Sequence, residues 1–251
     1  LKDKLEQWYP DFEYASKITI YDLLHHTSGI FSFNNDTTDD KVGDYKSPVQ
    51  LLEIARDRKN LFPPGQYWHY SNTGYLLLAL IAEKIENKPF YKIVDEKIST
   101  PYGLSSMRTL APAEQPENLA LGHKDSMAFN YDYSPLLGAG NLVSKSEDIA
   151  YMLYQLLTGK IFSKAVVHNW LSDLYPMFDQ GLYYGQGIMI YNFPELNGTK
   201  NMWIGHSGGT PYYRTIVLYD AESQIILALA INQATSATAF AMNILQKIKK
   251  Y

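Results

Sequence analysis

Cysteine is absent from the 251 residues, which excludes disulfide bonds, thiolate metal ligands and a cysteine nucleophile. A large excess of charge of either sign is also absent, because 22 Lys and Arg residues and 26 Asp and Glu residues give a net charge of only -4. Nucleic-acid-binding proteins usually carry a basic excess or stripe, and this sequence has neither. The longest apolar runs, residues 75–82 and 225–231, are far shorter than a membrane span. We therefore expect no nucleic-acid partner and no transmembrane segment in this chain.

The six histidines form no metal-binding pattern, because no His-Glu-x-x-His occurs and His25 and His26 cannot both face one ion from a helix. We expect no metal and no other cofactor. The first residues, LKDKLEQWYP, contain neither an initiator methionine nor the apolar core of a signal peptide. From this we expect Leu1 to lie within a longer protein, and the compartment stays undetermined.

Helix starts are indicated by capping boxes, in which a Ser or Thr and a residue three positions later satisfy each other's backbone N–H groups. The pattern occurs at Thr19, Ser47 and Ser144. Residues 73–86 are apolar on nearly every face, which predicts a buried helix. Its N-terminal cap is expected to be one of the two residues before it, Ser71 or Asn72.

Strand patterns gather towards the end of the chain. Turn residues at Asn197-Gly198 and Ala221-Glu222-Ser223 predict hairpins, so the strands around them should be antiparallel. An amphipathic helix is predicted at residues 236–250. The strand-like runs are residues 183–193, 201–209, 213–220 and 224–233.

Together these patterns predict an α+β fold with two regions. A mostly helical region, residues 1–175, carries a Tyr-Ser-Asn motif. An antiparallel sheet with a C-terminal helix, residues 176–251, carries a His-Ser-Gly motif.

Tyr70, Ser71 and Asn72 stand between a Pro-Pro-Gly turn and the buried helix. A tyrosine with an unperturbed pKa of about 10 is a poor base at neutral pH, but nearby cations can favour its phenolate. Two structural interpretations stay open beside this catalytic one. Tyr70 can be a core tyrosine with a satisfied hydroxyl, and Asn72 can be a helix cap.

His206, Ser207, Gly208 and Gly209 end a predicted strand. Two glycines after a serine let a substrate approach the backbone closely, where N–H groups can face an acyl oxygen as in an oxyanion hole. The alternative is a glycine bulge beside a partly buried histidine.

The motifs together resemble the serine β-lactamase and penicillin-binding protein superfamily, and the closer match is the branch with class C β-lactamases, D-alanyl-D-alanine carboxypeptidases and related esterases. The resemblance covers the chain from about Leu1 to near its end. It implies a β-lactamase/transpeptidase-like α+β fold, here without the N-terminal helix and strands of the sheet. The matching segments, in the expected order, are ITIYDLLHHTSGI, LFPPGQYWHYSNTGY, GAGNLVSKSEDIAYML, YGQGIMI and GHSGGTPYYRTIVLYDAESQIILALAINQ.

An acyl-enzyme mechanism follows from this resemblance, in which a serine of a Ser-x-x-Lys motif attacks a carbonyl. Tyr70 would relay a proton from that serine to the leaving group, and Asn72 would hold the acyl side-chain amide of the substrate and the lysine of that motif. His206 would face a substrate carboxylate or the phenolate. Ser207 would contact that carboxylate, and Gly208 and Gly209 belong to the same substrate-binding strand. Within it, the Gly209 N–H would be one oxyanion donor. For His26, the resemblance implies a structural hydrogen bond.

Two departures from the family pattern matter. No Ser-x-x-Lys occurs in the 251 residues, so the nucleophile is expected about twenty residues before Leu1, and this chain alone is expected to be inactive. The third motif has His206 where β-lactamases have lysine, and an imidazole carries only part of a positive charge at pH 7. This favours a carboxypeptidase or esterase over a β-lactamase.

We therefore expect a penicillin-recognising serine hydrolase that acts on small molecules or peptidoglycan-type peptides. A class C-type β-lactamase and a non-catalytic cell-wall-binding homologue remain the alternatives. Self-association through the face left by the missing segment is a further expectation. The resemblance implies a periplasmic or extracellular location.

Overall fold

The computed structural model of the chain describes residues 1–35, 46–111, 114, 116–124, 127–129, 136–197 and 202–248. These residues form two compact units. The first contains residues 1–97, 108–117 and 132–142, and the second contains residues 98–107, 118–131 and 143–251. The sequence-based division at residue 175 stays a prediction about domains, which these units do not test.

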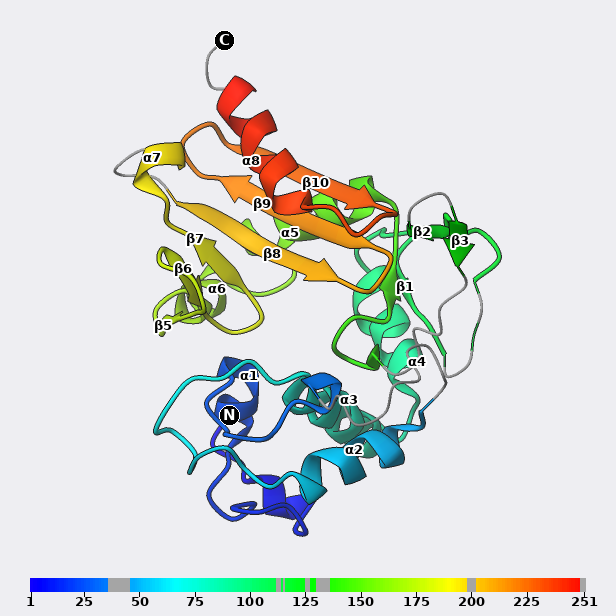
Figure 1. Cartoon of the computed structure of the whole chain (residues 1–251), viewed down its shortest axis with the longest axis vertical. Coiled ribbons are helices and arrows are strands. Elements are labelled where there is room, and N and C mark those ends of the chain that lie inside the picture. The colour runs from blue at the N-terminus through cyan, green and yellow to red at the C-terminus, as the bar shows by residue number, and fades with distance from the viewer. Residues whose placement is uncertain are drawn as a thin grey trace. The chain divides into compact units, whose positions relative to one another are not determined.

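The first unit is mostly helical and is built around the buried helix α3 (Figure 1). Helices α1 and α2 pack against α3, and the shared core contains Leu23, Leu51, Leu76 and Leu77. The elements of this unit are η1 (Leu5–Gln7), α1 (Ile20–His25), η2 (Phe33–Asn35), α2 (Pro48–Asp57), α3 (Asn72–Glu86), α4 (Phe90–Val94) and β1 (Arg108–Thr109).

The second unit contains a six-stranded antiparallel sheet in the order β10-β9-β8-β7-β6-β5. Helices α8 and α5 both pack on β9 and β10, and Figure 1 shows them on opposite faces of the sheet. The bounds are β2 (Gly122–Lys124), β3 (Met127–Phe129), α5 (Ser146–Leu157), α6 (Lys164–Trp170), β5 (Tyr175–Pro176), β6 (Leu182–Tyr184), β7 (Met189–Tyr191), α7 (Pro194–Asn197), β8 (Trp203–Gly209), β9 (Arg214–Asp220), β10 (Ile225–Ile231) and α8 (Ala237–Ile248). Two further elements, η3 (Asp95–Ser99) and β4 (Leu142–Val143), lie where the chain passes from one unit to the other.

Several sequence predictions are confirmed. Both halves of the capping box are present at Thr19 and at Ser47, and Pro48 begins α2 as predicted. The hairpin between β9 and β10 and the C-terminal helix α8 are also found. In each case the signal is local, because the side chains that form the turn or cap are within a few residues of each other.

The capping box predicted at Ser144 is wrong. Helix α5 begins after Lys145, whose side chain makes no cap bond, and the Ser144 hydroxyl donates to the Lys145 carbonyl at 3.0 Å. Ser106 acts there instead: its hydroxyl accepts the Lys145 N–H at 3.0 Å and donates to the Asp148 carboxylate at 2.7 Å. A partner about 40 residues away therefore replaces the local one.

The predicted tight hairpin at Asn197-Gly198 is also wrong. Strands β7 and β8 do pair antiparallel, but helix α7 intervenes, and it begins at Pro194. Proline suits the first helical position, since its missing N–H has no partner there in any helix. Gly198 lies outside the described residues.

Candidate active site

The Tyr-Ser-Asn motif lies at the start of α3 in the first unit, and the His-Ser-Gly motif lies at the end of β8 in the second unit. We describe each half within its own unit. Tyr70, half-buried, precedes Ser71, the N-cap residue of α3, and Asn72 begins the helix.

Two segments that are far apart in sequence are joined next to Tyr70. The chain that leaves α1 runs beside residues 61–69, where the His26 carbonyl accepts the His69 N–H at 2.9 Å and the Thr27 carbonyl accepts the Gly65 N–H at 2.9 Å. Gly29 is required at this junction: its φ is +76°, and a Cβ there would meet the Phe62 carbonyl oxygen at 2.0 Å. The approach to the Tyr-Ser-Asn motif is therefore fixed by main-chain contacts.

The backbone of the motif is held by side chains from the segment after α1. The Ser71 N–H donates to Nδ1 of His26 at 3.1 Å, and the Asn72 N–H donates to the Ser32 hydroxyl at 2.8 Å. The Thr73 hydroxyl donates to the Phe31 carbonyl at 2.7 Å. The first N–H groups of a helix have no acceptors within the helix. The contacts with His26 and Ser32 give the Ser71 and Asn72 N–H groups acceptors, so that these groups are not buried without a hydrogen bond.

Sequence reasoning missed Ser32 and Thr73. Each bridges about 40 residues, and no spacing rule in the sequence links them to the motif. One indication of this bracing was present in the sequence. The segment around His26 resembles the family, and that resemblance implied a structural hydrogen bond for His26 only.

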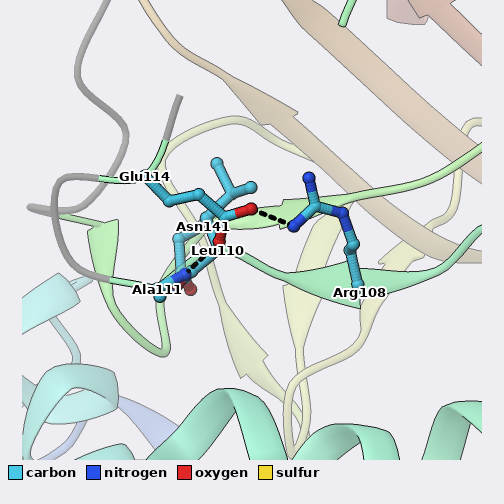
Figure 2. Close-up of polar contacts among 5 residues, drawn as sticks. All are labelled: Arg108, Leu110, Ala111, Glu114 and Asn141. Carbon is cyan, nitrogen blue, oxygen red and sulfur yellow. Dashed lines mark hydrogen bonds and ion pairs between the residues drawn. The ribbon is translucent and has the colours of Figure 1, made fainter. Parts of the chain in front are cut away.

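Asn141 contacts another segment of the first unit (Figure 2). It lies within one of the sequence segments that resemble the family. The side-chain amide of Asn141 donates to the Leu110 carbonyl at 3.0 Å, and the backbone carbonyl of Asn141 accepts the Leu110 N–H at 2.9 Å. Next to this pair, Glu114 forms an ion pair with Arg108 and accepts the Ala111 N–H at 2.8 Å. The Arg108 contact and the Ala111 N–H hold the pKa of the Glu114 carboxyl below its usual value. Asn141 therefore has a structural role here.

In the second unit, His206 packs edge-on against Tyr184, with ring centroids 5.9 Å apart. Part of its surface is exposed, but protein surrounds most of the ring, and this burial lowers the pKa of the imidazole. A backbone hydrogen bond with Ser207 acts in the opposite direction and is the smaller effect. His206 is therefore mostly neutral at pH 7. It carries less positive charge there than an imidazole with an ordinary pKa, which is the expectation from the sequence.

The N–H groups of Ser207 and Gly209 lie on the edge of β8 that faces away from β9. The Thr210 N–H donates to the Tyr213 carbonyl at 3.0 Å, towards β9, and successive N–H groups of a strand point to alternate sides. In the described residues, the pairing of β7 with β8 ends at Gly205, before these two residues. This strand edge therefore offers two backbone donors side by side.

The side chains around this edge are also defined. The Ser207 hydroxyl lies 3.7 Å from the sulfur of Met189. Arg214 crosses Gly209, where a Cβ would lie 3.0 Å from its guanidinium, and donates to the carbonyls of Thr210 and Tyr213. Arg214 therefore braces the β8–β9 turn with its guanidinium, and Gly208 and Gly209 stay exposed.

Among the residues that the structure describes, no group of three or more His, Asp and Glu side chains is arranged to hold a metal ion. None of the helices in the same residues is long and apolar enough to cross a bilayer. The candidate residues supply a phenol and an amide group in the first unit, and an imidazole, a hydroxyl and backbone donors in the second.

A mixed helical and antiparallel fold with these motifs is of the β-lactamase/transpeptidase type. The family model described as Beta-lactamase matches residues 1–249, and the chain therefore belongs to this family of penicillin-binding-protein-like serine hydrolases. The predicted superfamily and fold are confirmed.

Curated relatives include penicillin-binding protein 4* of Bacillus subtilis, which is 30% identical over 86% of this chain and 51% of its own length. Teichoic acid D-alanine hydrolase of Staphylococcus aureus is 26% identical over 92% of this chain and 55% of its own length. The chain thus spans about half the length of these curated relatives.

Solved structures with the same fold include the D-amino acid amidase of Ochrobactrum anthropi SV3 in complex with D-phenylalanine. Its TM-score is 0.84 at 22% identity, and the match covers 100% of this chain and 83% of that one. A D-stereospecific amidohydrolase from Streptomyces sp. has a TM-score of 0.82 at 23% identity, with 98% and 78% covered. These likenesses establish the fold.

Proposed function

We propose that this chain carries the proton-transfer and substrate-holding groups of a D-aminoacyl hydrolase, either a D-Ala-D-Ala carboxypeptidase or an esterase-like enzyme, that works through an acyl-enzyme. The observation that carries the proposal is the bracing of the Tyr-Ser-Asn turn, in which Ser71, Asn72 and Thr73 are each bonded to the segment after α1. Such bracing holds a phenol and an amide in fixed directions, as proton transfer and substrate orientation require.

Each motif residue has a proposed role. Tyr70 takes the proton from the attacking serine hydroxyl and passes it to the leaving group, and Asn72 holds the acyl side-chain amide. Gly209 donates its N–H to the carbonyl oxygen as negative charge develops there. Ser207 and His206 receive the substrate carboxylate. Gly208 has no side chain, which lets the substrate approach the strand closely.

The nucleophile itself is assigned to a segment outside residues 1–251, because these residues contain no Ser-x-x-Lys. The coverage of about half of each curated relative is compatible with this assignment. We accordingly expect residues 1–251 alone to form no acyl-enzyme, and the protein made from its natural reading frame to form one.

The neutral state of His206 favours a peptidase or esterase over a class C-type β-lactamase. A buried neutral imidazole offers a hydrogen bond to a carboxylate, whereas a cation would also offer charge attraction. Two of the proteins named above are, by their names, a D-alanine hydrolase and a D-amino acid amidase, so D-configured esters and amides are the substrates to test first.

The decisive experiment uses the protein from its natural reading frame with a fluorescent penicillin, nitrocefin, a D-Ala-D-Ala peptide, a D-alanyl ester and the L-alanyl ester. Stable penicillin labelling, no nitrocefin turnover and hydrolysis of only the D-configured substrates would support the proposal. Rapid nitrocefin turnover would establish the β-lactamase, and absence of both labelling and hydrolysis would leave the non-catalytic binding homologue.

The role of Tyr70 is tested separately. Tyr70→Phe should slow acylation by about a hundredfold or more, in line with losses of general acid–base catalysis. Tyr67→Phe is the matched control, because Tyr67 is 67% exposed, three residues away, and lies outside the proposed site. Near-normal acylation by Tyr70→Phe would remove Tyr70 from the mechanism. Self-association is kept as a separate proposal, tested by light scattering during size-exclusion chromatography.

A further inference from the structure

His26 occupies an unusual position at the end of α1. Its backbone is left-handed, with φ 60° and ψ 33°, and its side chain is fully buried. A residue other than glycine is uncommon in this conformation. Its imidazole lies close to Tyr70, with ring centroids 4.0 Å apart and planes inclined by 35°, and Tyr75 is the next ring, at 5.1 Å.

The same residue bonds the main chain on both sides of Tyr70. Its carbonyl accepts the N–H of His69 at 2.9 Å, and its Nδ1 accepts the N–H of Ser71 at 3.1 Å. A backbone N–H can only donate, so Nδ1 must carry a lone pair, and the proton of the neutral ring is then on Nε2. The bracket around Tyr70 thus fixes one tautomer of His26.

We propose that His26 is the positioning residue of Tyr70: its ring sets the plane of the phenol, and its two hydrogen bonds set the backbone from which the phenol projects. The catalytic consequence rests on the function proposed above. Misplacement of a reacting group by about 1 Å costs roughly a hundredfold in rate, so a residue that fixes Tyr70 without touching substrate has a large indirect effect.

Two substitutions separate the two contacts of the side chain. His26→Phe keeps a ring against Tyr70 and removes the acceptor. His26→Asn keeps an acceptor oxygen near the place of Nδ1, and asparagine tolerates the left-handed backbone, but the ring is lost. His69→Phe is the control, since His69 is the neighbouring exposed histidine.

The first measurements are spectroscopic and need no activity. Nitrogen-15 NMR should place the proton of wild-type His26 on Nε2. His26→Phe should raise the hydrogen-exchange rate of the Ser71 amide by about tenfold or more, whereas His26→Asn and His69→Phe should change it by less than about threefold. In His26→Asn, the Tyr70 ring signals should shift because the neighbouring imidazole ring is gone.

The kinetic measurement uses the protein expressed from its natural reading frame. His26→Phe should lower kcat by about tenfold or more while KM stays within about threefold, because the lost interaction orients a catalytic group and binds no substrate. A proton on Nδ1 in the wild type, or wild-type Ser71 exchange in His26→Phe, would overturn the proposal, because a residue that only fills space would give these results. If His26→Phe does not fold, the tautomer and His26→Asn still decide. A wild type without hydrolytic activity would refute the proposed function, and the NMR results would still test the bracket.

Discussion

Replacing Ser71 by alanine should stabilise the protein, although serine at a helix N-cap is normally stabilising. An N-cap Ser→Ala change usually costs about 0.5–2 kcal/mol because a side-chain bond to the helix backbone is lost. Ser71 makes no such bond. It is 1% exposed, and its hydroxyl has no hydrogen-bond partner among the described residues.

The magnitude follows from this burial. A buried polar group without a partner costs about 1–3 kcal/mol, and alanine removes the group while leaving the backbone N–H of residue 71 to His26. Allowing for the small space that the hydroxyl leaves, we expect a gain of about 1 kcal/mol in the free energy of unfolding. For a protein of this size that corresponds to a rise of about 2–4 °C in Tm.

The assay is urea and thermal denaturation of the wild type, Ser71→Ala and Ser47→Ala. Ser47 is the matched control, because its hydroxyl accepts the Gln50 N–H within an intact capping box. Its alanine variant should lose about 1 kcal/mol. If both variants are destabilised equally, the Ser71 hydroxyl has a partner in solution and the reasoning is refuted.

Two further predictions concern the sheet. Asp220 is fully buried and accepts the Trp203 indole N–H at 3.1 Å and the Glu222 N–H at 3.0 Å, so Asp220→Asn, which loses one acceptor direction, should cost about 2 kcal/mol. In a Trp203→Phe background the cost should fall, and an additive double-mutant cycle would contradict this account. For His206, the folded-state pKa lies below the usual 6.5, so protonation favours the unfolded state and stability is greatest above pH 6.5. As pH falls below 6.5, wild-type stability should decline more steeply than that of His206→Gln, by at most about 1.4 kcal/mol per pH unit, and parallel curves would refute burial of a neutral imidazole.

Local sequence signals predicted the elements that depend on neighbouring residues. The boxes at Thr19 and Ser47 and the β9–β10 hairpin each close within a few positions, so the residue types alone specify them. Motif order in turn predicted the family. The sequence therefore placed Tyr70 at a helix start and His206 on a strand.

Contacts across long sequence separations could not be predicted in this way. Ser106 replaces Ser144 at the start of α5, and Ser32 holds the Asn72 N–H from another loop. A serine hydroxyl can form hydrogen bonds with many different groups, and the partner that each of these two serines contacts is decided only when the chain folds. The left-handed backbone of His26 is a further case, since a Gly or Asn is the residue type that usually indicates it.

The two halves of the candidate site are held by different kinds of interaction, and this predicts different sensitivities to substitution. In the first unit, side chains of His26, Ser32 and Thr73 hold the motif, so truncating one side chain removes one specific contact. In the second unit, backbone pairing between β8 and β9 holds the Ser207 and Gly209 donors, and Arg214 adds bonds only to the turn beyond them. Backbone pairing does not depend on any one side chain. Single substitutions around Tyr70 should therefore strongly affect the proton transfer proposed for it, while exposed side chains along β9 should tolerate substitution with little effect on the proposed oxyanion donors.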